Sequence, residues 1–336
     1  MLVTCALTVN AQVPSHPQYI QKVPTYVSSD HGETLEQSFD MYFETWEPGV
    51  PLTEDDNFFI SRVKQRTRFV DTNTQVNSEM TQDRKMCWWC PIGISDKSWS
   101  AIPRYIFNAD NFSMWQYLDI HGNWSDGWIR VPAAFSDAAH RNGVENGCIL
   151  FFDSSVSANS STGKILSKLI EKNGDGTFKN AVKLIRFMKY YGIDGLGVNP
   201  EGSLSSSMVE PLKSFFEECH KVATEEEWHF KVHWYESMTN SGGVSWTDQL
   251  SMNNNEWFQR QGKDYPVTDM FMLNYNWTGN KLPNSAAVAK SLGRSSFDVY
   301  AGFDTQGRWI TDGYPGDPNG GWVKLKQNDI SLAMWG

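Results

Sequence analysis

From about residue 100 onward, the chain alternates between short apolar runs and amphipathic stretches. The apolar runs predict strands at 115–120, 148–152, 193–199, 230–235, 269–274, 299–303 and 331–335, and the expected helices between them include 132–142, 178–191 and 209–224. Such alternation is typical of β/α units around a parallel sheet. Because no glycine-rich phosphate turn follows the first strand, these seven units predict an α/β fold of the (β/α)8 TIM-barrel type rather than a doubly wound sheet.

The eighth strand of such a barrel has two possible sources. The chain ends at Gly336, directly after the seventh expected strand. Either an upstream segment at 86–94 supplies the missing strand, or the chain is truncated before its barrel closes. We expect the barrel domain to span residues 86–336.

The residues before the barrel divide into two segments. Residues 12–85 are polar and contain several prolines, and the charged stretch from Glu54 to Arg68 predicts one helix. We expect this segment to be an N-terminal extension that wraps the barrel. Residues 1–11 are apolar at first and end in Val9-Asn10-Ala11, which has the small-residue spacing of a signal-peptidase site. They predict a signal-peptide remnant and a secreted, periplasmic or cell-surface location, with a disordered end as the alternative.

Composition narrows the classes of partner. The formal net charge of −10 leaves no broad basic surface for phosphates, so nucleic acid is excluded as a partner. No apolar run is long enough to cross a membrane. Cys87 and Cys90 have metal-ligand spacing, but no second Cys or His pair completes a site, so we expect no metal and no cofactor. The 15 Trp, 12 Tyr and 19 Phe favour a sugar ligand, because aromatic faces stack on sugar rings.

Function in a barrel of this kind sits at the carboxyl ends of the strands. The segment 191–201 ends one expected strand with Asn199, Pro200 and Glu201. Side chains two residues apart on a strand point the same way, so Asn199 and Glu201 both face the barrel axis. Pro200 fits the last rung of the strand because it has no N–H to donate. The glycines at 195 and 197 are expected to leave room for a sugar ring.

This segment resembles the catalytic strand of glycoside hydrolase family 85, the endo-β-N-acetylglucosaminidases that cut between the two core GlcNAc residues of N-glycans. The similarity continues, in order, through 115–119, 137–143, 234–242, 271–277 and 302–308. The segment also parallels the family 18 chitinase pattern, in which Gly197 and Asn199 replace two aspartates while Asp194 and Glu201 are kept. Pro200 and Glu236 depart from the residues usual in family 85.

The resemblance implies substrate-assisted, retaining catalysis on N-linked glycans of glycoproteins or glycopeptides. The 2-acetamido oxygen attacks the anomeric carbon to form an oxazoline, while Glu201 acts first as acid and then as base. Asn199 holds the acetamido N–H, and Tyr235 donates a hydrogen bond to the acetamido oxygen. The remaining residues expected at the sugar are Trp246, Asn274, Trp277, Asp304 and Arg308.

Two alternatives stay open. The first is a two-carboxylate retaining glycosidase, with Glu201 as acid and either Glu236 or Asp304 as nucleophile. The second is a catalytically inactive glycan-binding module that keeps the aromatic cleft. Loss of the Asn199 amide separates the two mechanisms, because only substrate assistance depends on it.

Overall fold

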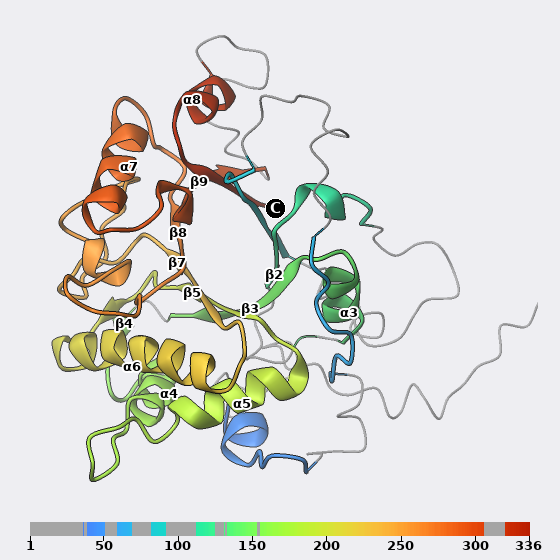
Figure 1. Ribbon diagram of the computed structural model, residues 1–336. Coiled ribbons are helices and arrows are strands. Elements are labelled where there is room, and N and C mark those ends of the chain that lie inside the picture. Colours follow the sequence, from blue (N-terminus) through green and yellow to red (C-terminus); the bar gives the residue numbers. More distant parts are fainter. Residues whose placement is uncertain are drawn as a thin grey trace, which may run out of the picture.

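The computed structural model describes residues 36, 39–50, 59–68, 82–91, 112–124, 131, 133–152, 155–305 and 320–336. Within these residues, eight parallel strands close into a barrel (Figure 1). In spatial order they are β1 (Met86–Pro91), β10 (Ser331–Trp335), β9 (Val299–Asp304), β8 (Met270–Leu273), β7 (Lys231–Tyr235), β5 (Gly195–Asn199), β3 (Glu145–Phe151) and β2 (Ile120–Trp124). The predicted TIM-barrel fold is therefore confirmed.

The upstream segment supplies the eighth strand. In β1, Cys87 pairs with Ala333 of β10 on one side and with Ile120 of β2 on the other. The barrel therefore closes, and the alternative of a barrel left open at its last strand is wrong.

The first expected strand, at 115–120, is wrong. A 3-10 turn, η5 (Trp115–Tyr117), stands in its place, and β2 begins only at Ile120. The apolar residues of this run, among them Trp115 and Leu118, pack in a small cluster with Ala139 of the neighbouring helix. The apolar residues of this run therefore reflect packing of a partly exposed turn outside the sheet.

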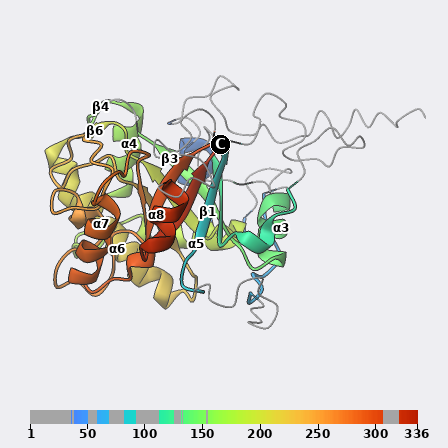
Figure 2. The same ribbon diagram turned by 90° about the horizontal axis from the view of Figure 1, so that it is seen from above.

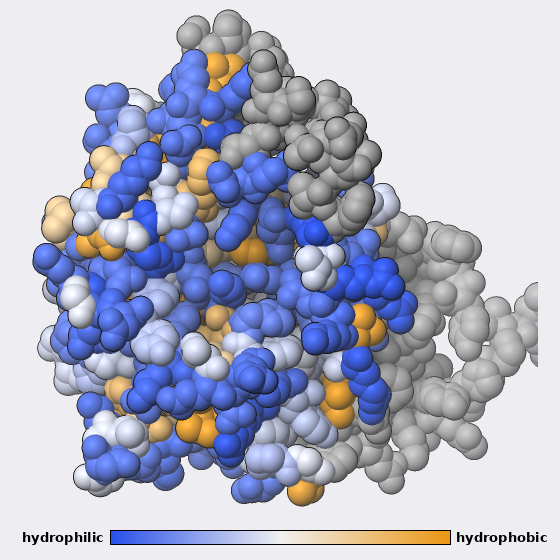
Figure 3. All heavy atoms as spheres, viewed as in Figure 1, coloured by the Kyte–Doolittle hydropathy of each residue, from blue (hydrophilic) through white to orange (hydrophobic). Residues whose placement is uncertain are grey.

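The helices lie outside the ring of strands (Figure 1). They are α3 (Ala133–Arg141), α4 (Ser161–Leu169), α5 (Ala181–Tyr191), α6 (Ser206–Glu225), α7 (Lys281–Ser291) and α8 (Gly321–Gln327). A two-stranded sheet of β4 (Ser155–Val156) and β6 (Ser203–Leu204) follows β3 and β5 at the carboxyl end of the barrel (Figure 2). Seen from the same side as in Figure 1, the surface of the described residues is mainly hydrophilic, with scattered hydrophobic residues (Figure 3).

Two apolar layers stabilise the barrel. A large core fills the space between the sheet and the helices, with Trp234 and Phe271 on the sheet side and Phe187 and Phe216 on the helix side. A smaller cluster fills the barrel interior and includes Cys87, Trp89, Met270, Met272, Tyr300 and Ala333. The interior is therefore packed with side chains, as is usual for an eight-stranded barrel.

The described parts of the N-terminal segment contact the barrel helices. Phe43 and Trp46, in and just after η2 (Asp40–Glu44), each pack against Phe187 of α5 with ring centroids 5.5 Å apart. Residues 59–68 form no helix, so the helix expected from Glu54 to Arg68 is wrong over its described part. Their backbone instead bonds to helix ends, as in Arg66 N–H to the His140 carbonyl at 3.0 Å. The boundaries at 11 and 85 stay a prediction, and residues 1–11 lie outside the described residues.

Candidate active site

A cavity of about 280 Å³ opens at the carboxyl ends of the strands. Its walls carry aromatic side chains from three strands and from the segment after β8, together with one amide and one carboxyl group: Trp89, Asn199, Glu201, Tyr235, Tyr275 and Trp335. A second cavity of about 920 Å³ lies at the opposite, amino-terminal end, where His140, Glu145 and Lys231 line it. Because barrel enzymes place their chemistry at the carboxyl end, the smaller cavity is the candidate active site.

Asn199 and Glu201 both line this cavity, as the strand periodicity predicts. β5 ends at Asn199, which is 3% exposed, and the Glu201 N–H donates to the Asn199 carbonyl oxygen at 3.0 Å. Burial raises the pKa of the Glu201 carboxyl above its usual value, while a hydrogen bond from the Asn199 side chain acts in the opposite direction. Since the Asn199 amide N–H faces Glu201, its side-chain oxygen is left to accept from another group.

Tyr235 ends β7, which pairs directly with β5, so it lies next to Asn199 around the rim of the barrel. Its hydroxyl donates to Asn274 Oδ1 at 2.6 Å, and Trp246 donates a side-chain hydrogen bond to it. Burial raises the pKa of this phenol far above its ordinary value, so the hydroxyl keeps its hydrogen. Trp246 is 50% exposed and does not line the described cavity. It lies at the edge of the site, next to Tyr235.

Asn274 lies behind Tyr235 and not in the cavity wall. Its Nδ2 donates to Asp248 Oδ1 at 2.7 Å, and the Lys281 ammonium lies 2.8 Å from Asp248 Oδ2. Asn274 is 7% exposed, and both ends of its amide are engaged by protein groups. The expected contact between Asn274 and a sugar is therefore not what the structure presents.

Trp277 also departs from expectation. Its side chain is 1% exposed, its indole N–H donates to the Gly302 carbonyl at 2.8 Å, and its ring packs 5.2 Å from that of Phe303. Trp277 is a core residue between β8 and β9, so it cannot stack on a sugar in this arrangement. Asp304 ends β9, partly buried and outside the cavity wall, and Arg308 lies outside the described residues.

Glu236 is fully buried and points away from the cavity. Its Oε1 accepts the Asp248 N–H at 2.8 Å, and Oε2 accepts from Thr247 at 3.2 Å and Asn254 at 3.4 Å. Burial raises the pKa of this carboxyl to about 7. Because Tyr235 faces the cavity, its strand neighbour Glu236 faces the loop that follows β7 and is not placed to attack a sugar.

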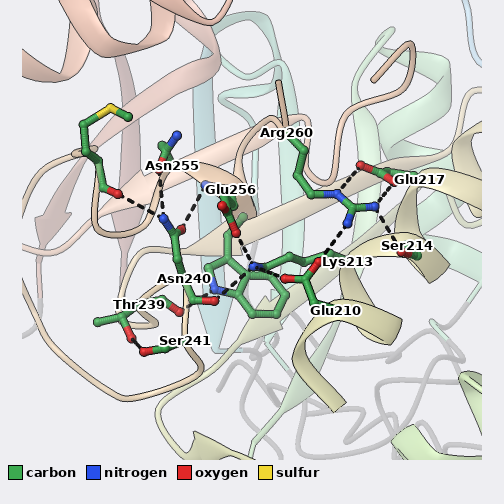
Figure 4. Close-up of polar contacts among 12 residues, drawn as sticks. Glu210, Lys213, Ser214, Glu217, Thr239, Asn240, Ser241, Asn255, Glu256 and Arg260 are labelled. Atoms are coloured by element: carbon green, nitrogen blue, oxygen red, sulfur yellow. Dashed lines mark hydrogen bonds and ion pairs between the residues drawn. The ribbon is translucent and has the colours of Figure 1, made fainter. Parts of the chain in front are cut away.

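The loop after β7 is held to α6 by a polar network (Figure 4). The Lys213 ammonium, whose side chain is fully buried, donates to Glu210 at 2.8 Å, to the Asn240 carbonyl at 3.0 Å and to Glu256 at 2.5 Å. It also lies 5.2 Å from the centre of the Trp257 ring. This network fixes the segment that carries Trp246 and Asp248.

With the barrel and its site defined, comparison with known proteins gives the family. The family model described as glycosyl hydrolase family 85 matches residues 96–336. The chain belongs to this family. It is a glycoside hydrolase by descent, as the resemblance of its strand-end motifs indicated.

Three similar proteins share 26–28% sequence identity with this chain. The glycoside hydrolase domain of Endo-D from Streptococcus pneumoniae R6 matches with a TM-score of 0.68 and 26% identity, over 90% of this chain and 46% of that chain. A protein named cytosolic endo-beta-N-acetylglucosaminidase 2, from Arabidopsis thaliana, is 28% identical over 68% of this chain and 31% of its own length. The Homo sapiens cytosolic endo-beta-N-acetylglucosaminidase is 26% identical over 67% of this chain and 28% of its own length. This chain thus spans about a third of these two curated relatives.

The family 85 relatives contradict one prediction. Those from Arabidopsis thaliana, Danio rerio and Homo sapiens are all named cytosolic, so the predicted secreted, periplasmic or cell-surface location is wrong. In the described part of the chain, no helix is both long and apolar enough to span a membrane.

Sequence reasoning missed several residues of this candidate site. Trp89, Tyr275 and Trp335 line the cavity, and Asp248 supports Asn274. Alternation along β1 places Cys87 and Trp89 on the same face of the strand, so the inward position of Trp89 could have been predicted from the sequence. Asp248 follows no strand and has a positive φ of 57°, so nothing in the local pattern marks it. Gly195 gives its space to the His233 ring and not to a sugar, because a Cβ there would lie 2.5 Å from His233 Cε1.

Proposed function

We propose that this chain is an endo-β-N-acetylglucosaminidase that hydrolyses the GlcNAc-β1,4-GlcNAc core of N-linked glycans by substrate-assisted, retaining catalysis. One observation carries the proposal. Among the described residues that line the cavity, Glu201 is the only carboxyl group, and it lies beside the Asn199 amide. A glycosidase with a single carboxyl group needs a nucleophile from its substrate, and the 2-acetamido oxygen of GlcNAc is one.

The first chemical step forms an oxazoline ring in its protonated, oxazolinium form, because the acetamido nitrogen keeps its hydrogen. The acetamido oxygen attacks the anomeric carbon, the bond to the leaving oxygen breaks, and Glu201 gives its proton to that oxygen. The raised pKa of Glu201 supports this role, because an acid must hold its proton at the working pH. The free side-chain oxygen of Asn199 accepts the acetamido N–H and makes the acetamido oxygen a better nucleophile. The Tyr235 hydroxyl contacts the acetamido oxygen.

The second step opens the oxazoline. Glu201, now ionised, takes a proton from a water molecule that attacks the anomeric carbon from the face the leaving group left. Two displacements at one carbon give net retention of configuration. The aromatic wall formed by Trp89, Tyr275 and Trp335 supports the binding of a sugar ring, because C–H faces of sugars stack on aromatic rings.

The test is mass spectrometry of a high-mannose glycopeptide incubated with the purified chain. The expected product is a peptide that keeps one GlcNAc on its Asn, and this product is lost with Glu201→Gln and with Asn199→Ala. Cleavage that persists in Asn199→Ala favours a two-carboxylate mechanism. Binding of the glycopeptide without cleavage by the unaltered chain favours an inactive glycan-binding module.

A further inference from the structure

We propose that Asn274 is a positioning residue for Tyr235, fixed in one orientation by Asp248. The inference rests on the proposed function, because it assigns Tyr235 a place in that reaction. The three side chains form one hydrogen-bonded chain across β7, the following loop and β8. Tyr235 Oη lies 2.6 Å from Asn274 Oδ1, and Asn274 Nδ2 lies 2.7 Å from Asp248 Oδ1.

The direction of each hydrogen bond follows from the chemistry of Asp248. A carboxylate accepts hydrogen bonds and donates none, and the Lys281 ammonium lies 2.8 Å from Asp248 Oδ2. Asn274 must therefore turn its NH2 group toward Asp248, which leaves its carbonyl oxygen facing Tyr235. That oxygen only accepts, so the Tyr235 hydroxyl must be the donor. The charge on Asp248 thus sets the direction of a hydroxyl two side chains away.

The loop backbone supports this placement. Asp248 has a φ of 57°, in the left-handed region, and its N–H is bonded to Glu236 at 2.8 Å. Its Oδ1 also accepts the Asn276 N–H at 3.2 Å. Asp248 and Asn274 are both 7% exposed, so the chain is shielded from solvent. A buried amide with both ends bonded has one orientation here, since the reversed one would place its oxygen against the Asp248 carboxylate, acceptor against acceptor.

The consequence is a Tyr235 oxygen that is in place before a ligand arrives. In the free protein the Tyr235 O–H points to Asn274 Oδ1, while the Trp246 N–H donates to the Tyr235 oxygen. An acetamido oxygen in the cavity receives the hydrogen when the O–H bond rotates about the C–O bond, without movement of the ring. Such prior placement lowers the cost of reaching the reactive arrangement.

Two substitutions at one position test the assignment. Asn274→Leu has a similar size but no hydrogen-bonding group, so kcat should fall about 10-fold at every pH, the worth of one or two buried hydrogen bonds. Asn274→Asp regains the pattern only when protonated, because its carbonyl then accepts from Tyr235 and its O–H donates to Asp248. The matched control is Asn284→Asp, an exposed position on α7.

The pH dependence of Asn274→Asp has a definite sign. Burial and the nearby Asp248 carboxylate raise the pKa of the introduced carboxyl, so it is protonated at low pH and ionised at high pH. The ratio of variant to wild-type kcat should lie near one at about pH 5 and fall at least about 10-fold by about pH 8. Dividing by wild type removes the titration of groups present in both proteins, and those that face this position are Asp248, Lys281, Tyr235, Glu201 and Glu236.

A double-mutant cycle measured by urea unfolding tests the hydrogen bonds between Tyr235, Asn274 and Asp248 independently of catalysis. We expect the loss in urea midpoint for Asn274→Leu with Tyr235→Phe to be clearly less than the sum of the two single losses, because the two side chains share one bond. In an active enzyme, the double variant should also be no slower than Tyr235→Phe alone. If the wild-type protein does not cleave, the proposed function is overturned. The double-mutant cycle then still tests whether the hydrogen bonds between Tyr235 and Asn274 stabilise the fold.

The assignment is overturned by any one of three results. These are a wild-type kcat in Asn274→Leu, a flat ratio for Asn274→Asp across pH, or additive urea midpoints. A pH-dependent ratio that appears equally in Asn284→Asp also overturns it, since the effect would then come from added charge alone.

Discussion

Glu201 combines partial exposure with a carboxyl that burial makes harder to ionise. Its pKa is raised, mainly by desolvation, and the aromatic wall next to it includes Trp335. A general acid acts in its protonated form, so kcat should be highest at low pH and decline as the pH rises through the pKa of Glu201 in the complex.

A substitution that lets water reach Glu201 should shift the pH at which kcat declines. In Trp335→Ala the carboxyl is better solvated, its pKa falls, and the decline in kcat begins at lower pH than in wild type. The pH profile of kcat measures this shift. Trp228→Ala is the control, because Trp228 lines the cavity at the opposite end of the barrel. Identical profiles for wild type and Trp335→Ala would mean that desolvation does not set the acidity of Glu201.

At the scale of residues, the sequence predicted Asn199, Glu201 and Tyr235 because each stands at or just past the end of a strand. The position of a residue along a strand determines which way its side chain points, and this brings the three side chains to one cavity. Trp277 and Asn274 were misplaced for the same physical reason. Both follow β8, where the chain leaves the strand and the alternation of faces no longer holds.

At the scale of elements, the loop from β7 to residue 260 carries Trp246 and Asp248, and Lys213 holds it to α6. Lys213→Met removes three donors while keeping the apolar stem. Glu210 and Glu256 are exposed enough to be solvated instead, so the free energy of unfolding should drop by only about 1–2 kcal/mol. The larger effect should be faster proteolysis within 239–257.

Limited proteolysis with mapped cut sites, together with urea unfolding, checks this expectation. Lys221→Met is the matched control, since Lys221 lies on the same helix but is 59% exposed. Equal cleavage rates in the two variants would show that Lys213 does not hold the loop. No sequence pattern predicted the hydrogen bonds of Lys213, because the bonded residues lie up to 43 positions apart in the chain.

The periodicity of apolar residues located six of the eight strands, from β3 to β10, closely enough to predict the fold. It erred at 115–120 because this run forms a 3-10 turn whose Trp115 and Leu118 pack against α3 outside the sheet. The first strand, β1, was left as one of two options, because the local pattern at 86–94 did not distinguish it from a barrel that stays open. Closure of the barrel decides between those options, and closure depends on the whole molecule.

At the scale of the molecule, buried Asp–His pairs tie the helices to the amino-terminal end of the barrel. Asp194 contacts His140 of α3 at 2.8 Å and His229 at 2.7 Å, and it accepts the Asn146 N–H at 2.7 Å. Burial acts to raise the pKa of Asp194, but the bonds from the two histidines lower it below its usual value. A similar pair joins Asp269 to His220 at 2.7 Å.

A depressed carboxyl pKa stabilises the fold above the ordinary pKa of Asp and loses that effect as the pH falls below about 4. Asp194→Asn should lower the free energy of unfolding at neutral pH by about 3 kcal/mol, because it breaks a buried pair. It should also flatten the acid limb of the stability curve. Urea unfolding at several pH values measures both effects, with the exposed Asp329→Asn as control. An unchanged acid limb in Asp194→Asn would assign acid sensitivity to other carboxyl groups.

The central claim is that the substrate supplies the nucleophile while Glu201 and Asn199 assist it. The most direct measurement is kcat/KM for glycopeptides whose scissile GlcNAc carries an acetyl, fluoroacetyl, difluoroacetyl or trifluoroacetyl group on its nitrogen. Each fluorine withdraws electrons from the amide oxygen and weakens its attack on the anomeric carbon. We predict a steady and steep fall in kcat/KM along this series. Equal rates for all of these substrates would place the nucleophile in the protein and contradict the account.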